Sequence, residues 1–365
     1  MNRLFLLSSA VLALAALPRA ASAQPAPTSK KLIEFGWDEP DPAFLRKHIS
    51  QMEKTPFDGT VFHVKSDFLW QGWGRRTFTE AELAPAIEDL KQTKFKKFTH
   101  NFLRFNVAQG NVDWFDDFSP VLNNARLAAK VARIGNAAGI LFDIEQYNAQ
   151  PFNYSKQRDE KSKSWAQYAG KTRERGRELM DAFQQEFPDL VVFLTWSYSL
   201  PFQQTRGDEK RLATVPYGLL KPLLDGMFEA ARGKTKIVDG FESSYGYKTE
   251  KQFDDVQTML TRTVLPWTPD RDRYRQRTSL GFGLWLDNDW RKKGWNEKDH
   301  SKNHFSPQQF EASLKKALAT SDEYVWIYTE TPRWWSEPDG KPLKLPIEYD
   351  RAIRRAAGKD RPLSP

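Results

Sequence analysis

An Asp-Ile-Glu sequence from Asp143 to Glu145 is the strongest candidate for chemistry in this chain, because it ends a short apolar run. Side chains alternate along a strand, so the two acids share one face and Ile144 lies on the other. Burying two adjacent carboxyl groups costs free energy unless they are paired or used. Their repulsion raises one pKa, so one group could hold a proton for acid catalysis. The structural alternative is an ion network with Arg104 or Lys65.

Hydrolysis of a glycosidic bond needs two carboxyl groups, one to protonate the leaving oxygen and one to attack the anomeric carbon or to activate water. Glu242 is the first candidate partner, since it ends a predicted strand and small residues follow it. Glu330 is the second, with an ion pair to Arg333 as its structural alternative. The predicted catalytic residues are therefore Glu145, Asp143, Glu242 and Glu330, with Glu145 as the proton donor.

Further polar and aromatic side chains fall near the ends of the predicted strands and are expected to bind substrate. Sugar rings present flat C–H faces that stack on aromatic side chains, and the chain has 13 Trp, 11 Tyr and 25 Phe. Aromatic residues also fill protein cores, so composition alone does not decide their role. The predicted substrate-binding residues are Asp38, His63, Asn101, Trp196, Tyr245, Trp285, Asp287 and Trp334.

The elements that would position these residues alternate between short apolar runs and helix-like segments. Expected strands cover residues 32–37, 59–64, 98–105, 139–144, 190–196, 237–241, 280–286 and 324–329. Helix signals follow each strand, such as Asp41-Pro42, the Thr79/Glu82 capping box and Ser306-Pro307. The pattern predicts an α/β fold, a single-domain (β/α)8 TIM barrel with its site at the carboxyl ends of the strands. A doubly wound open sheet is the alternative, but its Gly-rich first turn is missing.

The start of the chain is typical of a secretory signal peptide. Asn2 and Arg3 precede an apolar stretch at residues 4–17, and small residues at 21–23 suit cleavage. We expect a signal peptide at 1–23, an extended leader at 24–31, a catalytic barrel at 32–357 and a flexible tail at 358–365. The mature protein would be secreted or periplasmic, without a membrane span; an N-terminal anchor is the alternative. With no Cys, the fold cannot depend on disulfides.

The formal net charge of +8 does not by itself indicate a polyanionic partner. The basic residues are scattered and acids lie between them, which favours a solvated surface over a nucleic-acid site. An acidic polysaccharide remains open as a substrate, because a basic protein attracts it.

The segment from Gly139 to Glu145 resembles the fourth strand of barrel glycoside hydrolases. It is similar to the end of the Asp-x-Asp-x-Glu motif of chitinase-like enzymes, which implies Glu145 as the acid and Asp143 as its helper. Leu141 stands at the motif's first Asp, so the resemblance does not extend to substrate-assisted cleavage of an N-acetyl sugar. The chain also resembles secreted bacterial barrel proteins of glycosidase type, notably at residues 142–147, 173–180 and 239–242. This resemblance implies a glycosidase but no particular substrate; the wider expectation, from the acids, the aromatic residues and the signal peptide together, is carbohydrate metabolism and polysaccharide degradation.

Two other kinds of function stay open. One is a carbohydrate-binding barrel without turnover. The other is a polysaccharide lyase or metal-dependent hydrolase using His63, His100, Asp143 and Glu145, or calcium at residues 287–289; the chain lacks the usual zinc-binding motifs. No phosphate-binding loop, Gly-x-Ser-x-Gly elbow or Cys nucleophile is present. We therefore expect neither a cofactor nor a metal; the oligomeric state is left open.

Overall fold

The computed structural model describes residues 30–289, 292, 294–335 and 345–359. The predicted signal peptide and nearly all of the predicted leader and tail lie outside these residues. In the part of the chain that is described, no helix is long and apolar enough to cross a membrane.

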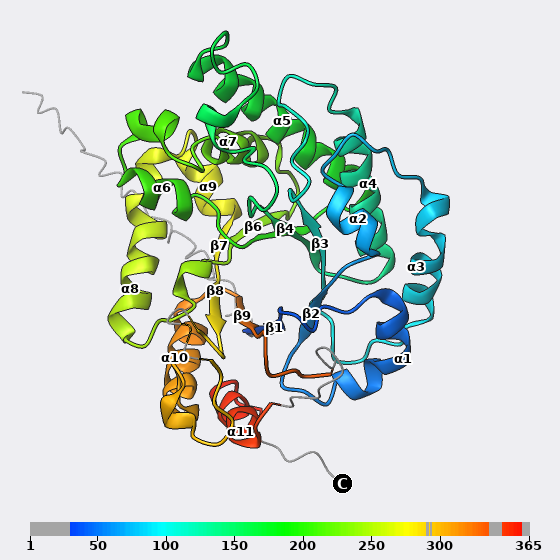
Figure 1. Cartoon of the computed structure of the whole chain (residues 1–365), viewed down its shortest axis with the longest axis vertical. Helices are drawn as coiled ribbons and strands as arrows, with labels where there is room; N and C mark the ends of the chain where they lie inside the picture. The colour runs from blue at the N-terminus through cyan, green and yellow to red at the C-terminus, as the bar shows by residue number, and fades with distance from the viewer. Residues whose placement is uncertain (1–29, 290–291, 293, 336–344, 360–365) are drawn as a thin grey trace, which may run out of the picture.

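The strands of the described residues form one parallel sheet in sequential order (Figure 1). Strand β7 pairs with β6, and β8 pairs with β9. Because only Gly281 separates β7 from β8, the two are halves of one barrel strand and close the ring. The (β/α)8 barrel prediction is confirmed, and the doubly wound alternative is wrong. The strands are β1 (Lys31–Glu34), β2 (Gly59–Phe62), β3 (Phe102–Asn106), β4 (Gly139–Asp143), β5 (Val191–Leu194), β6 (Lys236–Asp239), β7 (Thr278–Leu280), β8 (Phe282–Trp285) and β9 (Tyr324–Tyr328).

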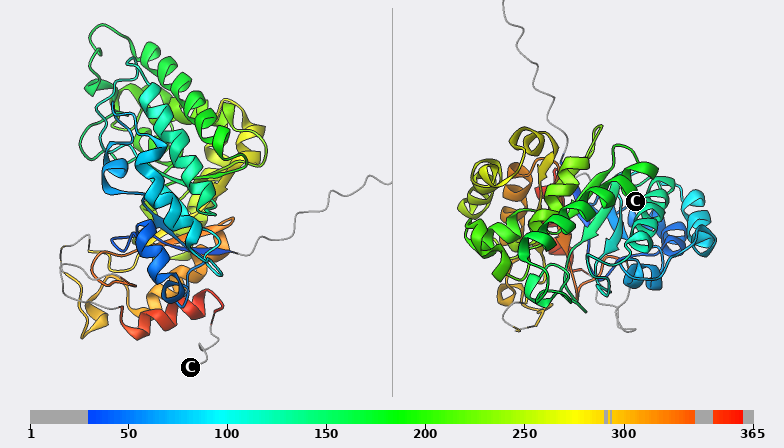
Figure 2. Two further views of the ribbon diagram at one scale, coloured as in Figure 1. Left: turned by 90° about the vertical axis from the view of Figure 1, so that its right-hand side faces the viewer. Right: turned by 90° about the horizontal axis from the view of Figure 1, so that it is seen from above.

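Helices surround the strands, as the two further views in Figure 2 show. The expected starts are confirmed at Asp41, whose side chain accepts the Phe44 N–H, and at Thr79 and Ser306, which form capping boxes. The principal helices are α1 (Pro42–Met52), α2 (Ser66–Gln71), α3 (Glu80–Gln92), α4 (Ser119–Ile134), α5 (Trp165–Glu186), α6 (Ser199–Thr205), α7 (Leu220–Ala230), α8 (Glu250–Thr258), α9 (Arg271–Arg277), α10 (Pro307–Thr320) and α11 (Ile347–Ala356).

Alternation along β4 sets the direction of the candidate acids. Leu141 packs in the cluster that fills the barrel interior, whereas Ile140, Phe142 and Ile144 pack in the layer between strands and helices. Asp143 lies two residues after Leu141, on the same face of β4, so it also faces the interior, at the carboxyl end of the strand. The predicted separation of the two faces of this strand is confirmed.

Most strand bounds differ from expectation by a few residues, and three of these differences concern predicted site residues. The third strand begins at Phe102, since the Asn101 side chain accepts the Thr60 N–H before the ladder starts. The fourth ends at Asp143, whose side chain accepts the Glu145 N–H. The sixth ends at Asp239, so Glu242 lies three residues beyond it, at the start of the 3-10 helix η3 (Glu242–Ser244).

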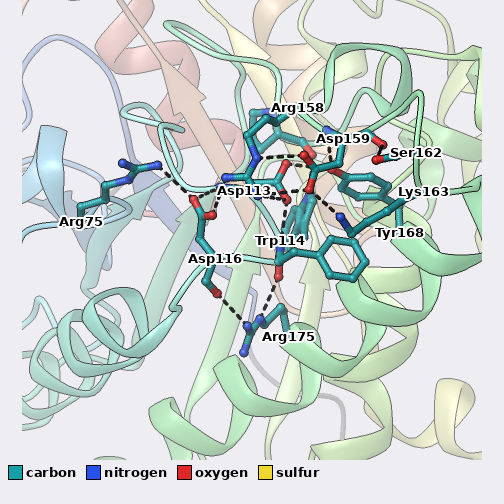
Figure 3. Close-up of polar contacts among 12 residues, drawn as sticks. Arg75, Asp113, Trp114, Asp116, Arg158, Asp159, Ser162, Lys163, Tyr168 and Arg175 are labelled. Carbon is teal, nitrogen blue, oxygen red and sulfur yellow. Dashed lines mark hydrogen bonds and ion pairs between the residues drawn. The ribbon is translucent and has the colours of Figure 1, made fainter.

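A polar network holds the long loops after β3 and β4 against α5 (Figure 3). The Arg158 guanidinium lies 2.5 Å from an Asp116 carboxylate oxygen and 3.8 Å from one of Asp113. The buried Tyr168 hydroxyl donates to Asp113 at 2.9 Å. Arg175 on α5 donates to the Asp116 carbonyl at 3.0 Å. These contacts fix the part of the β4–α5 loop that is farthest from Glu145, which lies near the start of the same loop.

Candidate active site

A cavity of about 810 Å³ opens at the carboxyl ends of the strands, within the usual size range of small-molecule sites. Each side of the barrel contributes ionisable or aromatic side chains to it. They include Trp37 and Glu39 after β1, His63 and Trp70 after β2, Arg104 on β3, Asp143, Glu145 and Tyr147 at the end of β4, Glu242 and Tyr245 after β6, Trp285 on β8, and Tyr328 and Glu330 at the end of β9.

The carboxyl groups of Glu145 and Glu242 both line this cavity, and each of them shifts the pKa of the other. Mutual repulsion opposes ionisation of both groups, so the pair favours a state that keeps one proton. Burial, the Glu145 charge and the Asp143 charge hold the pKa of Glu242 well above its usual range. Burial and Asp143 also raise the pKa of Glu145, but the side chains of Tyr147 and Glu242 and the charge of Arg104 oppose that rise. The proton therefore belongs on Glu242.

Each carboxyl of the pair also has a tyrosine partner. The Tyr147 hydroxyl lowers the pKa of Glu145, and the Tyr245 hydroxyl lowers that of Glu242. Burial and the neighbouring acids raise the pKa of both phenols, so both stay protonated and act as donors. Each tyrosine is close to its glutamate in the sequence: Tyr147 lies two residues after Glu145, and Tyr245 lies three residues after Glu242.

Asp143 is held in an ion network with Arg104, the structural alternative considered from the sequence. One Asp143 oxygen accepts two Arg104 N–H groups, at 2.6 and 3.1 Å, and the other accepts the Glu145 N–H at 3.0 Å. Arg104 also donates to Glu39 at 2.8 Å. Asp143 therefore holds the Arg104 guanidinium and also the backbone N–H of Glu145 in place. Lys65 pairs instead with Asp67, at 3.2 Å.

Glu242 is positioned by an unusual backbone turn. Phe241 has φ 39° and ψ 62°, in the left-handed region that non-glycine residues rarely adopt. The fully buried Asp239 accepts the Phe241 N–H at 3.1 Å and the Ser199 hydroxyl at 2.9 Å. The Glu242 N–H then donates to the Thr195 carbonyl at 3.0 Å. Bonds to Thr195, just after β5, and to Ser199 on α6 thus hold the turn that aims Glu242 into the cavity.

Seven of the twelve predicted site residues line the cavity: Glu145, Asp143, Glu242, Glu330, His63, Tyr245 and Trp285. Glu330 accepts the Tyr328 hydroxyl at 3.2 Å, and the His63 ring nitrogen Nδ1 lies 3.7 Å from a Glu39 oxygen.

The other five are used within the fold. Asp38 is buried and accepts the Trp334 N–H, while the Trp334 ring packs on Phe57. Asp287 accepts the N–H groups of Glu330 and Thr331 and of the Trp285 indole, so it shapes the rim beside Glu330.

Asn101 and Trp196 also lie outside the cavity lining. Asn101 precedes β3 and bonds to the Thr60 N–H and the Phe98 carbonyl, so its predicted place at the carboxyl end of a strand is wrong. The Trp196 indole donates to the Ser243 hydroxyl at 2.9 Å, beside Glu242.

Several cavity residues were missing from the predicted set, notably Glu39, Arg104, Trp37, Tyr147 and Trp70. The first four lie at or just after predicted strands, so their positions were a usable signal. Trp70 sits on the short helix α2 after β2, and the sequence offered only an aromatic residue in a connecting segment. Within the described residues, no cluster of three or more His, Asp or Glu side chains has the arrangement of a metal site.

No protein-family model matches the sequence, and no curated protein matches it. Solved structures do resemble it. A glycoside hydrolase family 5 enzyme from Prevotella bryantii B14, a mutant in complex with a xyloglucan tetradecasaccharide, aligns over 88% of both chains at 6% identity with a TM-score of 0.52. A second structure of that enzyme, also at 6% identity over 88% of both chains, gives 0.51. At this identity the likeness is one of fold: the chain has a (β/α)8 barrel like that of these glycoside hydrolases.

Proposed function

We propose that this protein is a glycoside hydrolase that cleaves O-glycosidic bonds of a poly- or oligosaccharide, with Glu145 and Glu242 as its catalytic pair. The observation that carries the proposal is that these two carboxyl groups line the same cavity at the barrel mouth and interact electrostatically there. Two carboxyl groups in opposite protonation states are what glycosidic cleavage requires.

The roles follow from the surroundings of each acid. Glu242 is the more deeply buried and keeps the proton, so it is the general acid. Glu145 has the Arg104 charge and the Tyr147 hydroxyl to support its ionised form, so it is the nucleophile. This reverses the roles expected from the sequence, where Glu145 was the proton donor.

We infer that the reaction retains the anomeric configuration. Inverting enzymes hold their carboxyl groups roughly 6.5–9.5 Å apart to admit a water, whereas retaining enzymes hold them at roughly 5–5.5 Å. The mutual pKa effects of Glu145 and Glu242 indicate that their carboxyl groups lie close together, which supports the shorter, retaining separation.

The reaction proceeds in two displacements. Glu242 gives its proton to the glycosidic oxygen while a Glu145 carboxylate oxygen attacks the anomeric carbon, and the bond to the leaving sugar breaks. The Glu242 carboxylate then takes a proton from water as that water attacks the anomeric carbon. The ester to Glu145 breaks, the sugar leaves with a new hydroxyl, and both acids return to their starting states.

The test compares wild type with Glu145→Gln and Glu242→Gln on a panel of polysaccharides and aryl glycosides. We expect each variant to lose more than about a hundredfold in kcat/KM, about 2.7 kcal/mol of transition-state stabilisation, while staying folded by circular dichroism. Glu330→Gln, a third cavity carboxyl whose partner is Tyr328, is the matched control and should lose far less. Nuclear magnetic resonance of the first product should show the retained anomer.

Two outcomes would overturn the proposal. If wild type binds glycans without ever releasing reducing ends, the protein is a carbohydrate-binding barrel. If both Gln variants keep full activity, the catalytic acids lie elsewhere in the cavity, with Glu330 first to be examined.

We also propose export from the cytoplasm, on the signal-like pattern of residues 1–23. Mass spectrometry of the protein recovered from the periplasm or medium should give a mature N-terminus near Gln24. An N-terminus still at residue 1 or 2 in membrane fractions would instead support the anchored alternative.

A further inference from the structure

Exposed aromatic side chains are concentrated at the candidate active site. Four large hydrophobic residues are exposed among the described residues, and three of them line the cavity: Trp37 at 62%, Trp70 at 41% and Tyr147 at 50%. The fourth, Ile347, begins α11. Apolar surface left in water costs roughly 25 cal/mol per Å² relative to burial, so this concentration indicates a ligand with apolar faces.

The barrel order places two of these rings across the mouth from the general acid. Trp37 follows β1, Trp70 lies on α2 after β2, and Glu242 follows β6. In a closed ring of eight strands in sequential order, the second strand faces the sixth and the first faces the fifth. A ligand in the cavity therefore lies between Glu242 on one side and the Trp37 and Trp70 rings, here called the aromatic wall, on the other.

The aromatic wall is held by contacts with other residues that line the cavity. The Trp37 indole N–H donates to the Tyr328 hydroxyl at 2.9 Å, and the Arg333 guanidinium lies 5.4 Å from the Trp37 ring centroid. The Trp70 and Tyr147 rings meet edge to face, with centroids 6.0 Å apart. Rings fixed in this way lose little conformational freedom when a sugar stacks on them.

The charges of the cavity oppose an anionic ligand. Its lining carries five carboxyl groups, on Glu39, Asp143, Glu145, Glu242 and Glu330, against the cations Arg104 and Arg333. Arg104 is engaged by two of the acids, and the Arg333 guanidinium lies 3.9 Å from an oxygen of the buried Asp38. A uronic acid or sulfated sugar would meet repulsion here, although the whole chain is basic.

The size of the cavity exceeds what one sugar needs. Its volume of about 810 Å³ is near the upper end of the roughly 300–1,000 Å³ that sites for drug-sized ligands occupy. A monosaccharide would leave much of it filled with water, whereas a short run of sugar units would contact both Trp37 and Trp70.

From these observations we propose that the cavity binds a run of several uncharged pyranose units, stacked on Trp37 and Trp70, and rejects acidic polysaccharides. The inference rests on the proposed function, since it names the substrate class of that same site. It also decides the question of an acidic substrate, which the sequence left open.

The test measures binding by calorimetry to the Glu145→Gln/Glu242→Gln double variant, which should not consume the ligand. The probes are cello-, xylo- and manno-oligosaccharides of one to six units, and oligogalacturonates of equal length. Oligogalacturonates are also titrated into wild type, which keeps both carboxyl groups. Affinity for at least one neutral series should rise with length, and oligogalacturonates should bind at least tenfold more weakly, about 1.4 kcal/mol.

Trp37→Ala and Trp70→Ala, each added to the double variant, should weaken binding of that neutral series about tenfold, the scale of a lost stacking contact. Ile347→Ala is the matched control, an exposed hydrophobic side chain outside the cavity, and should leave affinity unchanged. The inference is overturned if no neutral series binds, if oligogalacturonates bind as tightly, or if both Trp variants bind like their parent.

Failure of this inference is distinguishable from failure of the proposed function. Length-dependent binding of neutral oligosaccharides without any turnover by wild type would keep the inference and remove the hydrolase. Turnover of a neutral glycan at rates that Trp37→Ala and Trp70→Ala do not change would keep the hydrolase and remove the aromatic wall.

Discussion

Glu145 and Glu242 line one cavity and shift each other's pKa, although they follow different strands, β4 and β6. Neither acid is placed by its strand alone. Asp143 holds the Glu145 backbone, and Asp239 holds the left-handed turn before Glu242. Asp143 and Asp239, two buried acids outside the catalytic pair, thus position the two side chains on which the proposed chemistry depends.

The first prediction concerns the pH dependence of activity. The raised pKa of Glu242 keeps it protonated well above the usual carboxyl range, so kcat/KM should fall on the alkaline side only when this proton is lost. The Asp143 charge raises the pKa of both acids, so Asp143→Asn should move both limbs of the profile to lower pH. A profile of Asp143→Asn that keeps both limbs in place would contradict this electrostatic role.

The second prediction separates the two functions of Tyr147. Tyr147→Phe keeps the ring beside Trp70 but removes the hydroxyl that lowers the pKa of Glu145. Loss of this polar interaction with an ionised group should lower kcat about tenfold or more, within the roughly 1.5–3 kcal/mol typical of hydrogen bonds to charged groups, and move the acid limb of the pH profile upward. KM should change little, because stacking is kept.

Steady-state kinetics across pH check this prediction, with Tyr217→Phe as the control. Tyr217 also lies next to this loop, but its hydroxyl accepts the Gln146 N–H rather than donating to a carboxylate. An equal loss of kcat in both variants would point to general loosening of the loop instead of a specific role for Tyr147.

The barrel could be predicted from the sequence because its signals are local. Each apolar run is short, and caps such as Asp41 and the Thr79/Glu82 box depend only on nearby residues. The face of β4 that carries Asp143 followed from simple alternation with Leu141. These features are set by neighbours in sequence, so no knowledge of the tertiary structure was needed.

The site was harder to predict because its contacts are long-range. An acid near a strand end can face the cavity, as Glu330 does, or turn back to bind backbone N–H groups, as Asp287 and Asp38 do. The sequence does not distinguish these two cases, because a polar residue at the rim of the barrel is compatible with either of them. The protonation order of Glu145 and Glu242 likewise depends on Arg104, which reaches the site from β3.

The third prediction concerns Asp239, whose full burial raises its pKa from 3.8 to about 6. Below the unfolded pKa both states hold the proton; as pH rises toward 6 only the folded state keeps it, so stability falls and then levels off. At about 1.4 kcal/mol per pH unit, this fall is up to about 3 kcal/mol. Asp239→Asn has no such proton, so the difference in unfolding free energy between wild type and variant should change by that order between pH 4 and 7.

Urea unfolding at several pH values checks the size and sign of this difference. Asp225→Asn serves as the control: that acid is also buried, but its oxygens accept the Lys221 ammonium and the Tyr198 hydroxyl. If wild type and Asp239→Asn show parallel pH dependence, Asp239 does not retain its proton in the folded state.

The fourth prediction tests the loop network of Figure 3. Tyr168 is fully buried and its hydroxyl donates to the nearly buried Asp113, so Tyr168→Phe leaves that carboxylate short of a donor. The expected loss in unfolding free energy is about 1–3 kcal/mol.

Arg158 is half exposed, so Arg158→Ala should cost at most about 1 kcal/mol despite its several ion pairs. Urea unfolding of both variants measures the ratio of the two losses in unfolding free energy. In limited proteolysis of Tyr168→Phe, the first cut should fall within residues 144–164. A larger loss for Arg158→Ala would mean that the exposed ion pairs, and not the buried hydrogen bond, hold the loop that carries Glu145.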